Sequence, residues 1–199
     1  MKAQISVITG DLVNSRRVDT PRYLAQLHTE LTALQQANQL TQFEIFRGDA
    51  FQAVGRPEHG LWLAVYLRCA LKAHHADALW DARIAVGLGK RRGRGDGYGS
   101  AFLNSGNALD QMTKNCRLAL KIDNERANAI VSDLLPMLDH NLSRLSQAEA
   151  QVVQARMLAP TNAQAAAAVR KAASTVSATL KRAAYDEIIR FIDAINRII

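Results

Sequence analysis

Two short runs of alternating apolar residues, at positions 43–46 and 50–54, constrain the fold of this chain more than any other feature. They flank Arg47, Gly48 and Asp49, and alternation on both sides of a glycine predicts a β-hairpin with its turn at Gly48. The elements expected around this hairpin are strands at residues 4–9, 83–88 and 116–122 and helices at 20–38, 57–77 and 100–112.

The resulting order, β-α-β-β-α-β-α-β, is the ferredoxin-like split βαβ pattern with one added unit. The predicted class is therefore α+β, with a ferredoxin-like sheet that carries its helices on one face. Thr20 is expected to cap the first helix, with Pro21 at its first position. After residue 124 the strand signal stops. We expect a first domain at residues 1–123, a connecting helix at 124–142 and an all-α module at 143–199.

The composition is that of a globular protein, with 48% hydrophobic and 22% charged residues. No apolar run approaches the ~20 residues that a membrane-spanning helix needs, and the N-terminus lacks the apolar core of a signal peptide. A cytoplasmic protein without a membrane partner is expected. The formal charge of +7 favours a polyanionic partner, either nucleic acid or nucleotide phosphate. Cys69 and Cys116 are expected to be buried free thiols.

Two aspartates stand at positions where a ferredoxin-like sheet can bring them together. Asp11 follows Gly10 at the end of the first strand, and Asp49 follows Gly48 at the hairpin tip. Two carboxylates in close contact repel each other unless a cation neutralises them, and Mg²⁺ binds one or two carboxylates together with phosphate oxygens. The pair therefore predicts a metal site. The alternative is turn chemistry alone, because aspartate is common in turns.

Three motifs carry a family resemblance. They are Thr-Gly-Asp-Leu-Val-Asn-Ser-Arg at 9–16, Arg-Gly-Asp-Ala-Phe-Gln at 47–52 and Ala-Phe-x-x-Ser-Gly-x-Ala-Leu-Asp at 101–110. Together they resemble the class III nucleotide cyclase palm, more distantly diguanylate cyclase domains, and more closely the SatD family. That family implies a bacterial protein with a cyclase-like palm domain followed by a helix-turn-helix.

The resemblance implies roles for individual residues. Asp11 and Asp49 match metal ligands, for Mg²⁺ or Mn²⁺. A nucleotide, with a purine nucleotide as a candidate, is expected to contact Leu12, Val13, Asn14, Ser15, Arg16, Gly48 and Asn104. The cyclases place a transition-state arginine four residues after that asparagine, where this chain has Ala108. Nucleotide binding is therefore favoured over cyclase activity, although Arg16, Arg83 or the loop arginines Arg91, Arg92 and Arg94 are candidate substitutes. The basic loop at 90–94 is expected either to reach phosphate or to be simply solvated.

The C-terminal module begins with a capping box, Ser146 and Glu149, and Thr161 is expected to cap a short helix. The pattern at 174–182 resembles the recognition helix of a helix-turn-helix. DNA contacts are expected from Ser174, Thr175, Ser177, Thr179, Lys181 and Arg182. Arg170 and Lys171 stand in the turn where a glycine and an apolar residue are usual. The alternative is a packing or dimerisation module, and the isoleucine-rich end of the chain is a candidate seam for a homodimer.

The leading hypothesis is a regulator in which a metal-dependent nucleotide-binding palm is coupled to a DNA-binding helix-turn-helix. The second hypothesis is a nucleotidyl cyclase or nucleotidyltransferase that uses Asp11, Asp49 and Mg²⁺. The third is a palm without catalytic activity that serves as an interaction scaffold.

Overall fold

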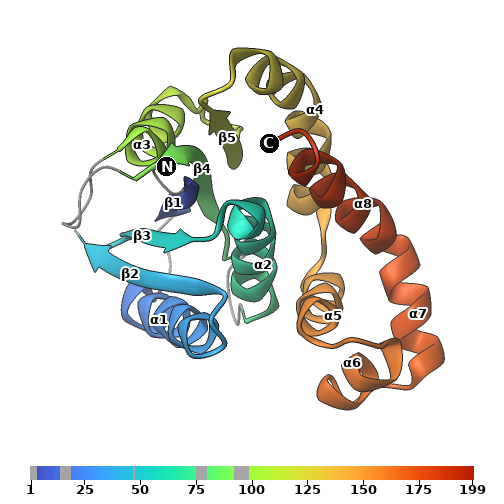
Figure 1. The fold of residues 1–199 in the computed structure, drawn as a ribbon. Helices are drawn as coiled ribbons and strands as arrows, with labels where there is room; N and C mark the ends of the chain where they lie inside the picture. The colour runs from blue at the N-terminus through green and yellow to red at the C-terminus, as the bar shows by residue number, and fades with distance from the viewer. Residues whose placement is uncertain (1–3, 14–18, 47, 75–79, 92–98) are drawn as a thin grey trace.

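The computed structural model describes residues 4–13, 19–46, 48–74, 80–91 and 99–199. Its centre is a five-stranded sheet in the order β2-β3-β1-β4-β5 (Figure 1). The strands are β1 (Gln4–Leu12), β2 (Leu40–Phe46), β3 (Ala50–Gly55), β4 (Ala82–Lys90) and β5 (Leu118–Ile122). The class is α+β, and the first four strands have the ferredoxin-like arrangement with β5 added at one edge.

The register of β1 fixes the neighbours of its last residues. β1 is antiparallel to both β3 and β4, with Asp11 opposite Ala50 on one side and Arg83 on the other. β5 is parallel to β4, as expected for strands joined by a crossover helix. The β2–β3 hairpin turns at Gly48, whose φ of 80° lies in the left-handed region that glycine adopts without strain. The hairpin predicted from the alternating pattern is confirmed.

Helices cover both faces of the sheet, which corrects the expectation of one face. On one face α1 (Thr20–Gln36) and α2 (Gly60–Ala73), preceded by the 3₁₀ turn η2 (Pro57–His59), pack on Ile8 and its neighbours. On the other face α3 (Ser100–Gln111) packs over β1, β4 and β5 (Figure 1). Successive strand residues point to opposite faces. Val7 and Ile8 are both fully buried, in different clusters, because helices cover both faces.

The α3 helix lies very close to β4 at Gly87. A Cβ atom at this position would stand 2.1 Å from the carbonyl oxygen of Ala101 and 2.3 Å from the amide nitrogen of Ser105. Both are backbone atoms, so they cannot move aside without moving the helix. Gly87 therefore sets the distance between α3 and the sheet.

The C-terminal part is all helical, as expected. It consists of α4 (Glu125–Arg144), α5 (Gln147–Leu158), α6 (Asn162–Ala168), α7 (Ala173–Arg182) and α8 (Tyr185–Asn196). The capping box of Ser146 and Glu149 is present, and the Thr161 side chain caps α6. The first helix differs from expectation, because Asp19 rather than Thr20 is its cap, accepting from the Arg22 amide.

The helical module packs directly on the first domain, with α5 against α2 (Figure 1). One hydrophobic cluster runs from the sheet through α2 into α4, α5, α7 and α8. Of the helices in the described ranges, none is long and apolar enough to cross a membrane. Cys69 is buried, Cys116 is partly buried, and both are free thiols.

A buried charge cluster joins the two parts of the chain. The guanidinium of Arg68 on α2, fully buried, donates from Nε and Nη2 to Asp81, each at 2.9 Å, and from Nη1 to Asp139 of α4 at 2.7 Å. The Lys72 ammonium donates to the carbonyl oxygen of Ser143 at 2.9 Å, near the junction of α4 and α5. Arg117 adds a bond of 3.0 Å from Nη1 to Asp81.

The backbone of Asp81 ties this cluster to the end of β1. Its carbonyl oxygen accepts from the Val13 amide at 2.9 Å and also from the Tyr23 hydroxyl. Asp81 itself is fully buried. One residue is therefore bonded at once to the segment after β1, to α1, to α2 and to Arg117.

Candidate metal- and nucleotide-binding site

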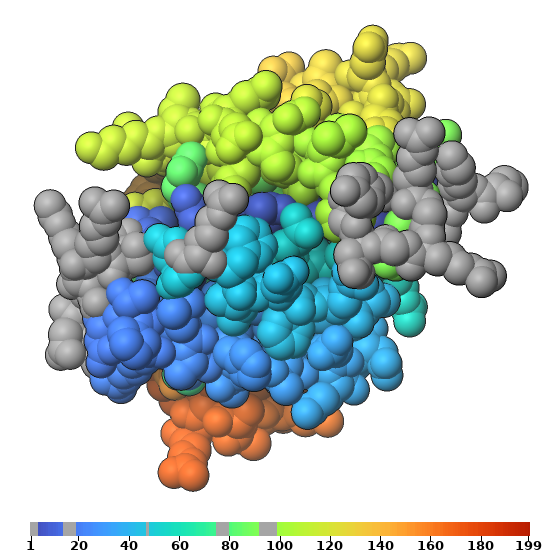
Figure 2. Space-filling view, turned by 90° about the vertical axis from the view of Figure 1, so that its left-hand side faces the viewer, coloured from blue at the N-terminus to red at the C-terminus, as the bar shows by residue number. Residues whose placement is uncertain are grey.

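The structure brings Asp11 and Asp49 to the same end of the sheet. Asp11 is the penultimate residue of β1, and Asp49 directly precedes β3. The Leu12 amide donates to the Asp49 carbonyl oxygen at 3.0 Å. Burial raises the pKa of Asp11, and the charge of Asp49 raises it further. This end of the sheet lies at the hairpin, which Figure 2 shows in cyan between α1 in blue and α3 in green.

Arg83 is the third charged residue of this site. It is the cross-strand neighbour of Asp11 on β4, so both side chains lie on the α3 face of the sheet. Its Nη1 donates to Asp11 Oδ2 at 3.4 Å. Its Nη2 donates to two carbonyl oxygens at the end of α3, those of Met112 at 3.0 Å and Leu109 at 3.4 Å.

Two atoms of this ion pair have no hydrogen-bond partner although they are buried. They are Asp11 Oδ1 and Arg83 Nε, and the only other such side-chain atom in the described ranges is Arg91 Nε. Burial raises the pKa of Asp11, Arg83 lowers it, and Asp49 raises it again, with a net upward shift. Buried polar atoms are normally satisfied, so an unpartnered carboxylate oxygen is a candidate ligand for a cation.

The ligands at this end of the sheet fit a magnesium or manganese site that water and phosphate complete. They do not fit a site in which the protein supplies every ligand. No group of three or more His, Cys, Asp or Glu side chains that could hold a metal occurs among the residues that the structure describes. Mg²⁺ is usually held by one or two carboxylates plus water and substrate phosphate. Asp11 and Asp49 supply that number of carboxylates, and Asp11 Oδ1 has no hydrogen-bond partner within the protein.

Residues 12–16 at the end of β1 were expected to contact the nucleotide, and for two of them the structure shows that the backbone amide is already bonded. The Leu12 amide is bonded to Asp49 and the Val13 amide to Asp81. Neither N–H is available for a phosphate oxygen. Asn14, Ser15 and Arg16 lie outside the described residues. Gly48 is exposed, and a Cβ atom there would meet nothing within 4 Å, so the hairpin turn leaves open space beside Asp49.

Asn104 does not lie at the aspartates. Its Nδ2 donates to the Leu88 carbonyl oxygen at 2.9 Å and to Asp123 Oδ1 at 2.8 Å. Leu88 is five residues along β4 from Arg83, toward the opposite end of the strand. The nucleotide role expected for Asn104 is thus not supported, because its amide holds α3 to the sheet. Ala108 is buried on the next turn of α3.

A chain of hydrogen-bonded polar side chains, Gln52, Thr9 and Ser105, lies next to the site and was not predicted from the sequence. Gln52 Nε2 donates to Thr9 Oγ1 at 3.2 Å, and Thr9 Oγ1 lies 3.0 Å from Ser105 Oγ. Thr9 shares the α3 face with Asp11, because it lies two residues earlier on the strand. The period-two alternation of β1 could have revealed this, since a threonine and an aspartate on one face interrupt an apolar pattern.

The proposed recognition helix, α7, presents most of the expected side chains to solvent. Ser174, Thr175, Ser177, Lys181 and Arg182 are exposed. Thr179 is buried, with 4% of its surface accessible, and accepts from Arg182 Nη2 at 3.2 Å. Its expected DNA contact is therefore not available in this arrangement. The other residues form a polar surface next to α6.

The turn between α6 and α7 accommodates Arg170 and Lys171, which stand where a glycine and an apolar residue are usual. Arg170 has a φ of 53°, in the left-handed region where glycine is usual. Its side chain is exposed, so the charge is solvated rather than buried. The Lys171 amide bonds to the Ala166 carbonyl oxygen at 3.0 Å and closes the end of α6. The turn between α6 and α7 is therefore made without the usual glycine.

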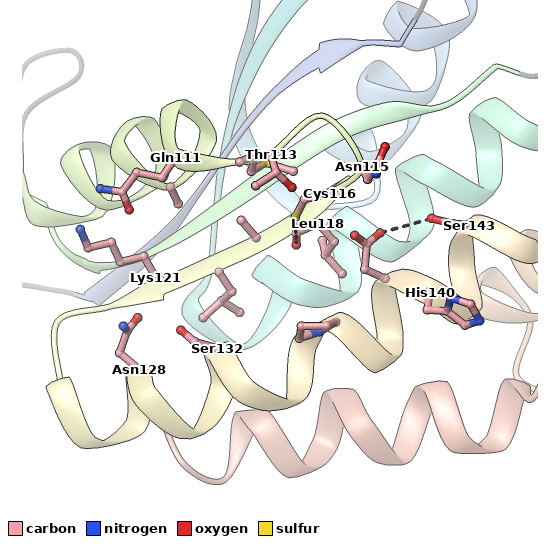
Figure 3. A pocket seen from close by; sticks show the side chains of 16 residues that line it. Gln111, Thr113, Asn115, Cys116, Leu118, Lys121, Asn128, Ser132, His140 and Ser143 are labelled. Carbon is pink, nitrogen blue, oxygen red and sulfur yellow. Dashed lines mark hydrogen bonds between the residues drawn. The ribbon is translucent and has the colours of Figure 1, made fainter.

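A groove lies elsewhere, between α3, the edge strand β5 and α4 (Figure 3). Its volume is about 720 Å³, and Cys116, Lys121, Ser132 and His140 are among its lining residues. A free sheet edge can pair with another strand, but a short edge that carries a lysine opposes such pairing. β5 has only five residues and includes Lys121. The groove is distinct from the aspartate pair.

No protein-family model and no curated protein matches the chain. Among solved structures, the chain is similar to the active GGEEF domain of a diguanylate cyclase from Vibrio cholerae, with a TM-score of 0.41 and 18% sequence identity. The similarity covers 62% of this chain and 85% of that chain.

Proposed function

We propose that the chain is a bacterial regulator of the SatD type, in which a palm domain binds a nucleotide through Mg²⁺ or Mn²⁺. The observation that carries this proposal is the buried, unpartnered Oδ1 of Asp11, next to Asp49 at an open hairpin turn. A cation between the two carboxylates would satisfy that oxygen and relieve the repulsion from Asp49, which adds to burial in raising the pKa of Asp11. Phosphate oxygens would complete its coordination.

Binding rather than turnover is the activity that this site supports best. The position where the resembling cyclases have a transition-state arginine holds Ala108, which is buried. Arg83, the described arginine bonded to Asp11, has its Nη2 bonded to the end of α3. Removing one electrostatic contact to a transition state typically costs about 10²–10³ in rate. A cyclase or nucleotidyltransferase activity is therefore the second candidate, supported by the aspartate pair alone.

Metal-dependent stabilisation by a nucleoside triphosphate tests the proposal. ATP or GTP at about 100 times its dissociation constant is expected to add ~2.7 kcal/mol to the free energy of unfolding. This corresponds to an increase of about 5–10 °C in Tm for a chain of this length. The increase should need Mg²⁺ or Mn²⁺ and should disappear in Asp11→Asn and in Asp49→Asn, measured by thermal unfolding.

The control is Asp110→Asn, because Asp110 is an exposed carboxylate at the end of α3. This variant should respond to the nucleotide as the wild type does. A full response that persists in Asp11→Asn would contradict the proposed site. The absence of any response to nucleotides in the wild type would favour the scaffold hypothesis.

DNA binding by the helical module is the second half of the proposal. It is supported by the exposed polar and basic surface of α7 and by the turn at Arg170. A homodimer would present two copies of α7, as helix-turn-helix proteins do on paired half-sites. Nucleotide binding would then change the DNA affinity through the contacts that join the two parts of the chain.

Electrophoretic mobility shift at several salt concentrations tests this half. Replacing Lys181 and Arg182 by alanine should reduce the slope of log affinity against log salt by about two, because each phosphate contact contributes about 0.9. Lys114→Ala, an exposed lysine on the other part of the chain, should leave the slope unchanged. No DNA binding at low salt, with or without nucleotide, would exclude the DNA-binding proposal.

A further inference from the structure

Arg83 is held in place more firmly than its partly exposed position suggests. Its backbone is paired with Asp11 in the centre of the sheet. Its Nη2 is bonded to the carbonyl oxygens of Leu109 and Met112. The C-terminal end of a helix carries partial negative charge, which stabilises a guanidinium there. Arg83 is therefore a fixed cation whose remaining Nη1 is directed at Asp11.

This fixed cation makes the two oxygens of Asp11 unequal. Oδ2 accepts from Arg83 Nη1 at 3.4 Å, whereas Oδ1 is buried and has no partner. A carboxylate with one oxygen held by a guanidinium has a single oxygen left for a metal. Arg83 thereby determines the number of oxygens that Asp11 offers and the direction of the free one.

We infer that Arg83 makes Asp11 a monodentate ligand, and that it thereby selects Mg²⁺ or Mn²⁺ against Ca²⁺. This inference rests on the proposed metal site. Mg²⁺ requires octahedral coordination at 2.0–2.1 Å, whereas Ca²⁺ takes six to eight oxygens at 2.3–2.6 Å and often binds both oxygens of a carboxylate. Because Arg83 occupies Oδ2, Ca²⁺ loses one possible oxygen ligand. Mg²⁺ and Mn²⁺ need only one oxygen of Asp11 and lose none. Arg83 is in this sense a positioning residue.

The inference depends on the shape of arginine as well as on its charge. A guanidinium presents several N–H donors in a fixed plane, so it can bond the α3 carbonyls and Asp11 at the same time. A lysine has one ammonium on a flexible chain and cannot reproduce that arrangement. Arg83→Lys keeps the charge and removes the fixed direction, while Arg83→Gln removes both.

The affinities of the full-length protein for Mn²⁺ and Ca²⁺ test the inference. Free Mn²⁺ is measured by its electron paramagnetic resonance signal, and Ca²⁺ is measured by competition. The wild type is expected to prefer Mn²⁺. Arg83→Gln should reduce the ratio of Mn²⁺ to Ca²⁺ affinity roughly tenfold, and Arg83→Lys should reduce it in the same direction, because both free Oδ2 for the larger ion.

The ratio distinguishes a positioning role from a general electrostatic or structural one. Removing a positive charge strengthens the binding of both divalent ions alike, and partial loss of structure weakens both alike. Lys114→Gln serves as the charge control and should leave the ratio unchanged. If Arg83→Gln fails to fold, Arg83→Lys, which retains the positive charge, is the variant to measure.

Failure of the proposed metal site and failure of the proposed role of Arg83 give different results. If the wild type binds neither Mn²⁺ nor Ca²⁺ at the aspartates, the proposed metal site is wrong. If the wild type binds Mn²⁺, binding is lost in Asp11→Asn, and the ratio is the same in the folded Arg83 variants, the metal site stands and the role of Arg83 is overturned.

Discussion

Asp81→Ala is expected to lower the free energy of unfolding by about 3–5 kcal/mol, the usual cost of removing one partner from a buried ion pair. Asp81 accepts two hydrogen bonds from Arg68 at 2.9 Å, and both side chains are fully buried. Without Asp81 the guanidinium of Arg68 keeps only Asp139 as a counter-charge, and Lys72 loses its nearest carboxylate, at 4.0 Å. Two cations would then remain buried with one partner carboxylate.

Urea unfolding at neutral pH measures this effect, with Asp133→Ala as the control because Asp133 is an exposed carboxylate on α4. The control should change stability by no more than about 0.5 kcal/mol, as is usual for exposed positions. A loss of less than 1 kcal/mol in Asp81→Ala would show that the cluster contributes little to stability.

The stability that Asp81 contributes is expected to decrease in acid. Burial raises the pKa of Asp81, but the charge and hydrogen bonds of Arg68, with Lys72, outweigh burial and lower it overall. A lowered folded-state pKa contributes stability above the unfolded-state value of about 3.9, and this contribution is lost as the pH falls through the folded-state value. The stability difference between wild type and Asp81→Ala should therefore be constant near neutral pH and decrease in acid.

Gly87→Ala is the other substitution with a large expected effect. The added methyl group would overlap the backbone of Ala101 and Ser105, so α3 would have to move away from β4. Overpacking of this kind typically costs 1–3 kcal/mol and occasionally more, and we expect about 3 kcal/mol because both clashes are with backbone. The same movement would displace the α3 carbonyls that hold Arg83, so the ratio of Mn²⁺ to Ca²⁺ affinity should also fall.

Gly106→Ala provides a matched control on the same helix. A Cβ atom at Gly106 would meet nothing within 4 Å, and alanine within a helix is more stable than glycine by roughly 0.5–1 kcal/mol. This variant should therefore be slightly more stable than the wild type in urea unfolding. Equal effects of the two substitutions would contradict the close approach of α3 to β4 at Gly87.

The sequence carries most of the information on the sheet. The alternation on both sides of Gly48 predicts the hairpin, and the order of elements predicts the strand order that places Asp11 beside Asp49. The face on which α3 packs is not encoded in the pattern of α3 itself. It follows from Gly87 and from the burial of both Val7 and Ile8, and a run of apolar strand residues indicates that both faces are covered.

The site was harder to predict than the sheet, because contacts between distant residues form it. Arg83 could be placed opposite Asp11 only once the register of β1 and β4 was known. Asn104 was assigned to the nucleotide by resemblance, whereas its hydrogen bonds to Leu88 and Asp123, both distant in sequence, give it a structural role. The engagement of the Leu12 and Val13 amides also depends on long-range contacts, which no local motif specifies.

The charge cluster around Asp81 bears on how such a chain can evolve. A first domain that was passed by recombination to another partner would leave behind Asp139 and the carbonyl oxygen of Ser143, which satisfy Arg68 and Lys72. The recipient would inherit two buried cations without part of their partners. The two parts of this chain are thus expected to be inherited together, and a gene that encodes the first 123 residues alone should yield an aggregating product.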